Sequence, residues 1–202
     1  AGEQHGPIGH QRYQSYVGDI HASGLHLLGV VNDILDISKL EAGEFELQIE
    51  NVDMAETVES ALRIVGERAQ RAGIKVDAKI VPALPLMRGD ARRVRQILLN
   101  LLSNSIKFTE PGGEVRISAG SVGGGGIEVT VADTGIGIAP DDLERAMAPF
   151  GQVDGKLSRK YEGTGLGLPL AKSLTELHGG DFRLESAVGE GTTVTLRFPV
   201  AA

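Results

Sequence analysis

The sequence predicts an α+β fold: a two-layer sandwich in which three helices cover one face of a mixed, mainly antiparallel sheet, preceded by one long helix. Apolar residues alternate along 115–119 and 127–131, with the glycines of 123–126 between them, which is typical of a β-hairpin. Apolar residues at steps of three and four along 90–106 indicate a helix before that hairpin, and a longer helix covers 13–41. Strands and helices in this order favour two packed layers.

The long helix carries a wide apolar stripe. Leu28 and Leu35 widen it beyond a two-stranded seam, which favours packing in a four-helix bundle. Gly43 is a suitable C-terminal cap, so we expect a first domain over 1–43 and a second over 44–202. A core helix of an ordinary globular domain is the alternative on periodicity alone. The regularly spaced residues of the stripe are Tyr13, Val17, Ile20, Leu27, Val31 and Ile34.

The second domain alternates strand patterns with helical ones. Gly73 closes its first helix and Asp90 caps its second. A polar, glycine-containing loop is expected over 149–165. The remaining predicted elements are a strand at 45–49, a helix at 58–72, strands at 74–80 and 86–88, helices at 140–148 and 166–178, and strands at 182–184 and 194–198.

The composition excludes several classes of protein. Hydrophobic residues make up 41% and charged residues 23%, which is typical of a globular chain and not of a disordered one. The formal net charge of −7 argues against a general electrostatic grip on nucleic acid or anionic lipid. Without cysteine, disulfides and thiolate metal sites are excluded. No apolar run approaches the ~20 residues of a membrane span, so we expect no membrane contact and a cytoplasmic location.

Two glycine-rich segments are candidates for binding a ligand. Residues 133–140 read Asp-Thr-Gly-Ile-Gly-Ile-Ala-Pro after a strand, and 163–168 read Gly-Thr-Gly-Leu-Gly-Leu at the start of a helix. Glycine lets a backbone approach a ligand closely, and free N–H groups at a helix N-terminus favour a phosphate. Neither segment has the spacing of a P-loop or a Rossmann fingerprint. A pair of tight turns is the alternative for either segment alone.

Three polar residues share one face of the helix before the hairpin. Asn100, Asn104 and Lys107 stand at i, i+4 and i+7, so their side chains project from the same side. Amides on an otherwise apolar helix are costly unless they have partners. A structural hydrogen bond between helices would satisfy them, and so would a bound ligand.

The order and spacing of these segments resemble the GHKL ATPase superfamily and, within it, the sensor histidine kinases. The resemblance covers 44–199 and implies a Bergerat-type sandwich that binds ATP or ADP. The segments that resemble the family's N box, G1 box, F box, G2 box and last turn are 100–108, 133–137, 149–151, 163–168 and 189–193.

The resemblance implies how the adenine is bound. Asp133 would accept a hydrogen bond from the adenine amino group, and Gly137 would let the backbone approach the base. Gly135 belongs to the same loop, and Phe108 would line the adenine pocket.

It also implies how the phosphates are bound. Asn104 would supply an oxygen ligand to Mg²⁺, while Asn100 and Lys107 would hold the phosphates. The loop 151–162 resembles the ATP lid, whose start Phe150 would anchor. Further nucleotide-binding residues are expected in the lid, at the start of the next helix and in the last turn, namely Arg159, Lys160, Gly163, Thr164, Gly165, Leu166, Gly167, Leu168 and Thr193.

Asn100 stands where the ATP-hydrolysing relatives carry a glutamate that activates water. An amide cannot serve as that base. The resemblance therefore implies a protein-histidine kinase of a two-component system, whose phosphoryl group passes to a response-regulator aspartate. Two alternatives stay open: a degenerate nucleotide-binding module that signals by conformation, and a GHKL ATPase.

The 13–41 helix resembles the second helix of the HisKA dimerisation domain of these kinases, which implies a homodimer of the full-length protein. The family's acceptor histidine is followed by an acidic residue, and neither His5 nor His10 has such a neighbour. We therefore expect a fragment that cannot phosphorylate itself, from a parent that can be anchored in the inner membrane. His178 is interpreted as a helix C-terminal cap that favours the dipole.

A finer resemblance is to the alphaproteobacterial cell-cycle and polarity kinases of the PleC and DivJ type. It rests on residues 6–9 with Arg12 and Tyr13, and on 151–170. It implies a single-domain response regulator as partner, docked on the helical hairpin of the dimerisation domain.

Overall fold

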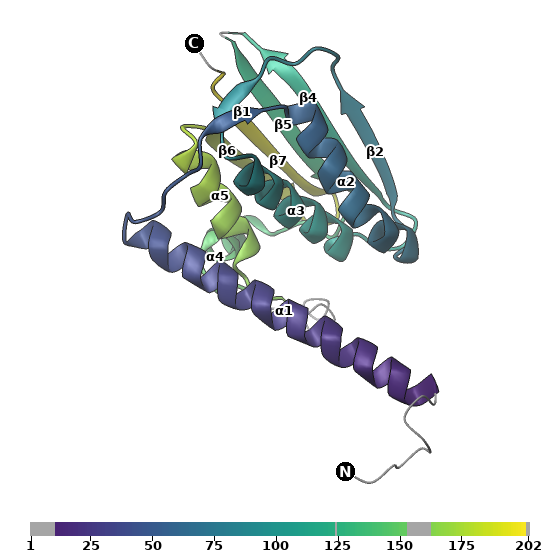
Figure 1. Ribbon diagram of the computed structural model, residues 1–202. Coiled ribbons are helices and arrows are strands. Elements are labelled where there is room, and N and C mark those ends of the chain that lie inside the picture. Colours follow the sequence, from purple (N-terminus) through teal and green to yellow (C-terminus); the bar gives the residue numbers. More distant parts are fainter. Residues whose placement is uncertain (1–10, 124, 153–162, 201–202) are drawn as a thin grey trace. The chain divides into compact units, whose positions relative to one another are not determined.

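The computed structural model describes residues 11–123, 125–152 and 163–200 (Figure 1). The chain divides into two compact units, Ala1–Glu44 and Phe45–Ala202. This division falls one residue after the domain boundary expected from the sequence. The second unit contains the sheet.

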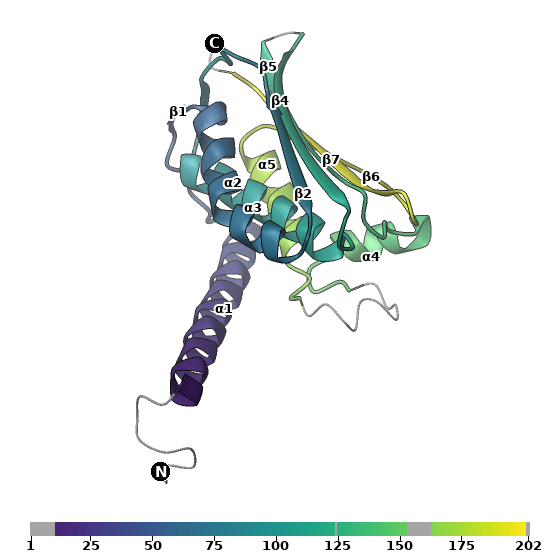
Figure 2. The ribbon, with the colours of Figure 1, turned by 90° about the vertical axis from the view of Figure 1, so that its right-hand side faces the viewer.

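The second unit is built around a five-stranded sheet with the order β2-β4-β5-β7-β6. β2 (Lys75–Ile80) pairs in parallel with β4 (Glu114–Val122), whereas β5 (Gly126–Asp133), β7 (Gly191–Phe198) and β6 (Asp181–Ala187) extend the sheet by antiparallel pairs. The helices α2 (Met54–Arg71), α3 (Ala91–Phe108) and α5 (Gly167–Leu177) lie on one face of this sheet (Figure 2). The predicted α+β two-layer sandwich, with its β4–β5 hairpin, is therefore confirmed.

The buried residues of these three helices recur every three or four positions, and α3 packs on β4 and β5, α2 on β2 and α5 on β6. The Asp90 carboxylate caps α3, as predicted, by accepting a hydrogen bond from the Arg93 N–H at 3.0 Å. The helices and the sheet thus share one core.

The strand predicted at 45–49 is wrong in position. The observed strand, β1 (Glu50–Val52), begins later and pairs antiparallel with β3 (Met87–Gly89) in a separate two-stranded sheet. The preceding segment bonds to a side chain instead of a ladder, since Gln48 N donates to Asp90 Oδ2 at 3.1 Å. Alternation of apolar residues there reflects partial burial without strand pairing.

The helix predicted at 140–148 has two parts. A 3-10 turn, η1 (Pro140–Asp142), leads into a short α-helix, α4 (Leu143–Met147). The Leu143 N–H bonds to Pro140 O, three residues back, which is the tighter 3-10 spacing. Proline at the first position suits this start because its missing N–H would have no partner there.

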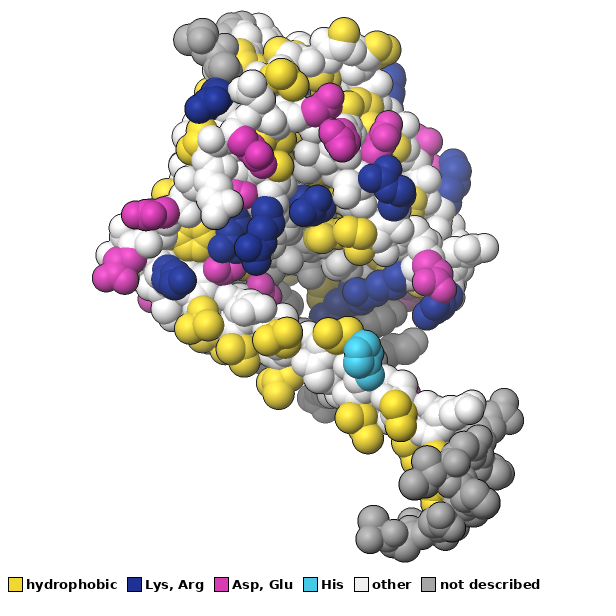
Figure 3. Space-filling view, viewed as in Figure 1, with side chains coloured by type: hydrophobic (Ala, Val, Ile, Leu, Met, Phe, Trp, Pro, Cys, Tyr) yellow, Lys and Arg dark blue, Asp and Glu magenta, His cyan; other side chains and the backbone are white. Residues whose placement is uncertain are grey.

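The first unit contains the predicted long helix, α1 (Gln11–Glu41). It ends where Gly43 takes a φ of +69° and donates to Leu40 O at 3.1 Å, as expected for a glycine cap. Apolar side chains are exposed along the helix (Figure 3), with Ile20 at 72% and Leu27 at 64%. A continuous apolar stripe this exposed is typical of a surface that packs against another helix.

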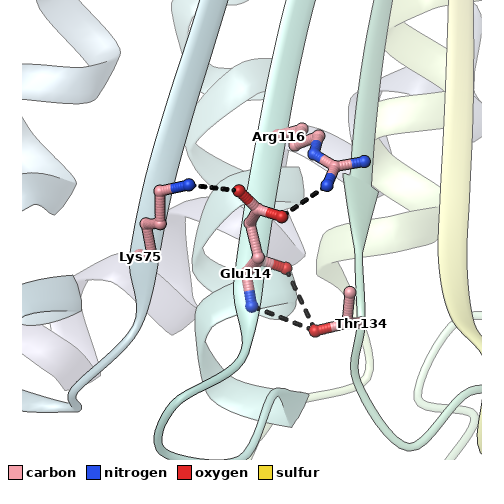
Figure 4. Close-up of polar contacts among 4 residues, drawn as sticks. All are labelled: Lys75, Glu114, Arg116 and Thr134. Carbon is pink, nitrogen blue, oxygen red and sulfur yellow. Dashed lines mark hydrogen bonds and ion pairs between the residues drawn. The ribbon is translucent and has the colours of Figure 1, made fainter.

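Charged side chains link β2 to β4 at the surface (Figure 4). Lys75 Nζ donates to Glu114 Oε1 at 2.9 Å, and the Arg116 guanidinium donates to the other carboxylate oxygen at 2.5 Å. These bonds, Lys75 first, hold the pKa of Glu114 below its usual value. Thr134 Oγ1 accepts from the Glu114 N–H at 3.0 Å, which ties the loop after β5 to the same strand.

His178 joins α5 to the start of α3. Its buried ring places Nδ1 2.7 Å from Leu174 O, and Nε2 accepts a hydrogen bond from the Asp90 N–H at 3.0 Å. Because the backbone N–H can only donate and the carbonyl can only accept, the ring is the neutral tautomer protonated on Nδ1. His178 is the C-terminal cap of α5, as expected, but its uncharged ring acts by bridging two helices and not through the helix dipole.

Candidate active site

Asp133 lies at the end of β5 and is held by hydrogen bonds from three different segments. Its Oδ1 accepts from Gly135 N at 3.0 Å and from Thr192 N at 3.1 Å, and its Oδ2 accepts from Ser105 Oγ at 2.8 Å. Bonds to both oxygens fix the plane of the carboxylate before any ligand arrives. The residue expected to read adenine is therefore immobilised by the fold.

The loop after Asp133 is wedged between α3 and the β6–β7 turn. A Cβ built on Gly135 would lie 2.6 Å from Phe108 O, and one on Gly137, whose φ is +66°, would overlap Ala187 O. The Ile136 N–H bonds to Phe108 O at 3.1 Å. Both glycines are thus required by contacts within the protein, whether or not a base approaches them.

Asn100 and Asn104 face the start of α5. A Cβ built on Gly167 would lie 3.4 Å from Asn104 Nδ2 and 3.8 Å from Asn100 Cβ. The amide of Asn100 donates one long hydrogen bond, of 3.4 Å, to Gly167 O. The fold therefore brings two segments that lie far apart in the sequence, the polar face of α3 and the second glycine cluster, into direct contact.

Lys107 continues that polar face and is half-buried. Its Nζ lies 4.6 Å from the centroid of the Phe108 ring, and a Cβ built on Gly163 would lie 2.5 Å from it. Burial is the main cause that lowers the pKa of Lys107, and the positive charge of Arg68 lowers it further. No carboxylate within the described ranges forms an ion pair with it. An anion at this position would offset both the burial of the ammonium charge and its repulsion from Arg68.

The two described ends of the predicted lid meet. Gln152 Nε2 donates to Gly163 O at 2.6 Å, and a Cβ on Gly165 would lie 2.8 Å from the carbonyl carbon of Phe150. Phe150 is 61% exposed and its backbone lies against Gly165, so its role in anchoring the lid stays a prediction. The predicted lid cations Arg159 and Lys160 lie outside the described residues.

The start of α5 divides its residues between core and surface. The Leu166 side chain is fully buried, so only its backbone N–H could reach a ligand, and that N–H lies 3.4 Å from Thr164 Oγ1. Leu168 is half-buried on the first turn of the helix. Pro169 has no N–H and the Leu170 N–H bonds to Leu166 O at 3.0 Å, so the N–H groups of Gly167 and Leu168 are the ones that a phosphate could use.

Sequence reasoning missed two residues around Asp133. Ser105 donates to it, and the N–H that reaches it from β7 belongs to Thr192, whereas the predicted Thr193 pairs with Ala132 and Glu185 in the sheet. A signal for Ser105 existed, because it is a polar residue at a buried position of an amphipathic helix. For Thr192 the signal is absent, since its contribution comes from the backbone.

Few protein ligands are available for a metal ion. The described ranges hold no group of three or more His, Asp or Glu side chains with metal-binding spacing. This donor set does not fit a metal held by protein alone, but it fits Mg²⁺, which takes one or two protein oxygens, keeps several waters and binds the substrate phosphates. The side-chain oxygen of Asn104 is the candidate ligand.

Comparison with known proteins gives a consistent answer. Residues 89–202 match the family described as histidine kinase-, DNA gyrase B- and HSP90-like ATPases. The non-motile and phage-resistance protein of Caulobacter vibrioides is 49% identical over 98% of this chain, and an uncharacterised sensor-like histidine kinase of Rhizobium meliloti is 44% identical over 98%. The histidine protein kinase DivJ of Caulobacter vibrioides is 45% identical over 96%, which confirms the predicted resemblance to DivJ-type kinases.

A solved structure with the same fold carries an ATP analogue. The crystal structure of full-length ShkA in complex with AMPPNP matches 95% of this chain at 35% identity, with a TM-score of 0.80, and the match covers 39% of ShkA. The chain spans 24%, 38% and 32% of the three relatives named above. It therefore corresponds to about a quarter to two-fifths of proteins of that kind.

None of the helices in the described ranges combines the length and the hydropathy that a membrane span requires.

The family match covers more than half of the chain and includes all of α3, the loop after Asp133 and the start of α5. The chain belongs to the family of histidine kinase-, DNA gyrase B- and HSP90-like ATPases, and it carries the ATP-binding catalytic domain of a sensor histidine kinase.

Proposed function

We propose that this domain binds Mg²⁺-ATP and transfers the γ-phosphoryl group to a histidine on the first helix of a dimerisation hairpin. The single observation that carries the proposal is the contact of Asn100 and Asn104 with the start of α5, with Lys107 on the same side. Two amides lie against this helix N-terminus, the ammonium group lies beside Gly163 just before it, and no carboxylate among the described residues forms an ion pair with that ammonium group. Such a collection suits a triphosphate.

The residues of the chain have separate tasks in this proposal. The Asp133 carboxylate accepts a hydrogen bond from the adenine amino group, and Lys107 neutralises phosphate charge. The backbone N–H groups at the start of α5 donate hydrogen bonds to the phosphates. The side-chain oxygen of Asn104 would hold Mg²⁺, which would supply positive charge next to the phosphates. Asn100 cannot take a proton from water, which favours transfer to a histidine over hydrolysis.

The acceptor and the partner are inferred from the relatives. We propose that the acceptor is a histidine followed by an acidic residue, on a dimerisation hairpin to which α1 would contribute the second helix. The phosphoryl group would then pass to the aspartate of a response-regulator receiver domain, and the full-length protein would form a homodimer. Because ATP and response regulators are cytoplasmic, the domain would act in the cytoplasm.

A transfer assay tests this proposal. The chain is incubated with γ-labelled ATP, Mg²⁺ and the dimerisation hairpin of DivJ, a relative 45% identical to it. We expect acid-labile, alkali-stable label on the hairpin and none on the chain alone. The Lys107→Met variant should lose most of the transfer, whereas Lys79→Met, at an exposed position of β2, should retain it.

Two results would support the alternatives. Sustained release of inorganic phosphate without the hairpin would identify an ATPase. Nucleotide binding with neither transfer nor release, tested against hairpins from several relatives, would identify a binding module that signals by conformation.

A further inference from the structure

Ser105 is a buried hydroxyl on the apolar side of α3. Only 6% of the residue is exposed, and its Oγ lies 2.8 Å from Asp133 Oδ2. Its backbone carbonyl accepts two hydrogen bonds from Thr109, from Oγ1 at 2.6 Å and from N at 3.1 Å. The last turn of the helix is therefore fixed, and the hydroxyl is held against the carboxylate.

The hydrogen bonds leave Asp133 with one defined place for a ligand. An ionised carboxylate offers about four acceptor positions, two on each oxygen. On Oδ1 both are taken, by the N–H groups of Gly135 and Thr192. On Oδ2 one is taken by Ser105. A ligand can therefore donate to Oδ2 alone, in the direction that Ser105 leaves open.

The Ser105 hydroxyl also fixes the polarity of this place. Because the carboxylate can only accept hydrogen bonds, the serine hydroxyl must donate its single hydrogen to Oδ2. What remains toward a ligand is lone pairs, on Oδ2 and on Oγ. A 6-amino group of a purine can donate a hydrogen bond to them. A 6-oxo group at the same position is itself an acceptor and would stay unpaired, and an unpaired buried polar group is costly.

We propose that Ser105 is a positioning residue that directs the last free acceptor of Asp133 to the exocyclic amino group of the nucleotide and thereby sets the preference for a 6-aminopurine. This inference rests on the proposed ATP site. It goes further in assigning base selectivity to a pair of side chains, Ser105 on α3 and Asp133 on β5, and in naming Oδ2 as the oxygen that reads the base.

The test compares two nucleotides that differ only in the amino group. ATP and the triphosphate of purine riboside, which lacks the 6-amino group, are titrated calorimetrically into the full chain and into variants. The wild type should prefer ATP. Ser105→Ala should reduce the ratio of the two dissociation constants by about tenfold, because the hydrogen bond to a charged group loses its aligned geometry.

Control variants separate positioning from folding. Ser173→Ala removes a half-buried serine from α5 and should keep the wild-type ratio. Ser105→Cys preserves the side-chain volume while weakening the donor, so it should reproduce the effect of alanine even if the alanine variant folds poorly. Thermal unfolding of each variant shows which measurements refer to folded protein.

Each outcome decides something. Equal weakening of both nucleotides by the Ser105 variants, or an unchanged ratio, would overturn the assignment of selectivity to this pair. Failure of the wild type to bind either nucleotide would instead overturn the proposed function and is distinguishable from the first result.

Discussion

The adenine side and the phosphate side of the site are built differently. Asp133 receives three hydrogen bonds from the protein, and the glycines beside it are locked by backbone contacts. On the other side, Asn100 makes one long bond and Lys107 carries a half-buried charge with no acidic partner among the described residues. The fold thus completes the base-reading half in advance, whereas the phosphate-binding half is left for the ligand to complete.

The largest effect is expected from the locked loop. Gly137→Ala would force a Cβ into Ala187 O at a positive φ, so we expect a loss of about 3 kcal/mol in the free energy of unfolding, together with loss of ATP binding. Gly189→Ala is the matched control, since its φ is +79° but nothing lies within 4 Å of the added carbon; it should cost about 1 kcal/mol. Urea denaturation and calorimetric titration measure both. Similar losses in the two variants would contradict the locking.

The bridge at His178 belongs to the scaffold and lies outside both halves, since its ring contacts Asp90 N, Leu174 O and Phe198. His178→Ala leaves the Asp90 N–H without its buried partner, so we expect a loss of about 2–3 kcal/mol in the free energy of unfolding. The affinity for ATP in the folded population should change by less than about threefold, because the ring contacts neither half. The control His21→Ala alters an exposed residue of α1. A large drop in affinity without a loss of stability would mean that the bridge acts on the site directly.

Lys107 should lower the stability of the nucleotide-free domain while raising its affinity for ATP. Because burial lowers its pKa in the folded state, the charged ammonium destabilises the nucleotide-free domain at neutral pH. Lys107→Met should therefore raise the free energy of unfolding by less than about 1 kcal/mol, since water still screens the half-exposed amine. The same change should weaken ATP binding by about tenfold.

The sign of the pH dependence checks the cause. The cost of the charge is present below the folded-state pKa of Lys107 and disappears as the pH rises through it toward the ordinary value of 10.5. The stability advantage of Lys107→Met over the wild type should therefore shrink between neutral and alkaline pH. An advantage independent of pH would assign the effect to packing.

The smallest effect is expected at the exposed cluster of Figure 4. Its contacts lower the pKa of Glu114, so the stabilisation is present above the ordinary value of 4.5 and is lost as the pH falls through the lowered one. Glu114→Gln should shift the denaturation midpoint less than Gly189→Ala does, and added salt should shrink the shift further. A shift that resists salt would show that the cluster is more than a surface ion pair.

Local patterns in the sequence predicted much of the fold. The period of α1, the cap at Asp90 and the β4–β5 hairpin depend on neighbouring residues, and all three are observed. The strand prediction for 45–49 failed because this segment bonds to the Asp90 side chain, 42 residues from Gln48 in the sequence. Alternation of apolar residues carries no information about such a contact. Long-range side-chain contacts override local periodicity there.

The site shows the same limit. The sequence indicated Asn100, Asn104 and Lys107 from their spacing, and the structure places the two amides against the start of α5 and Lys107 against Gly163. The bond from Ser105 to Asp133 could not be predicted, since it depends on how α3 packs on β5. The sequence could not show why residue 137 is a glycine, because internal packing and the close approach of a ligand both require one.

Calorimetric titration of Mg²⁺-ATP into the chain, beside Asp133→Ala and the exposed control Asp141→Ala, tests the central claim most directly. We predict saturable binding to the wild type and to Asp141→Ala, and no measurable binding to Asp133→Ala. Undiminished binding by Asp133→Ala would contradict the assignment of this pre-formed carboxylate as the reader of the base.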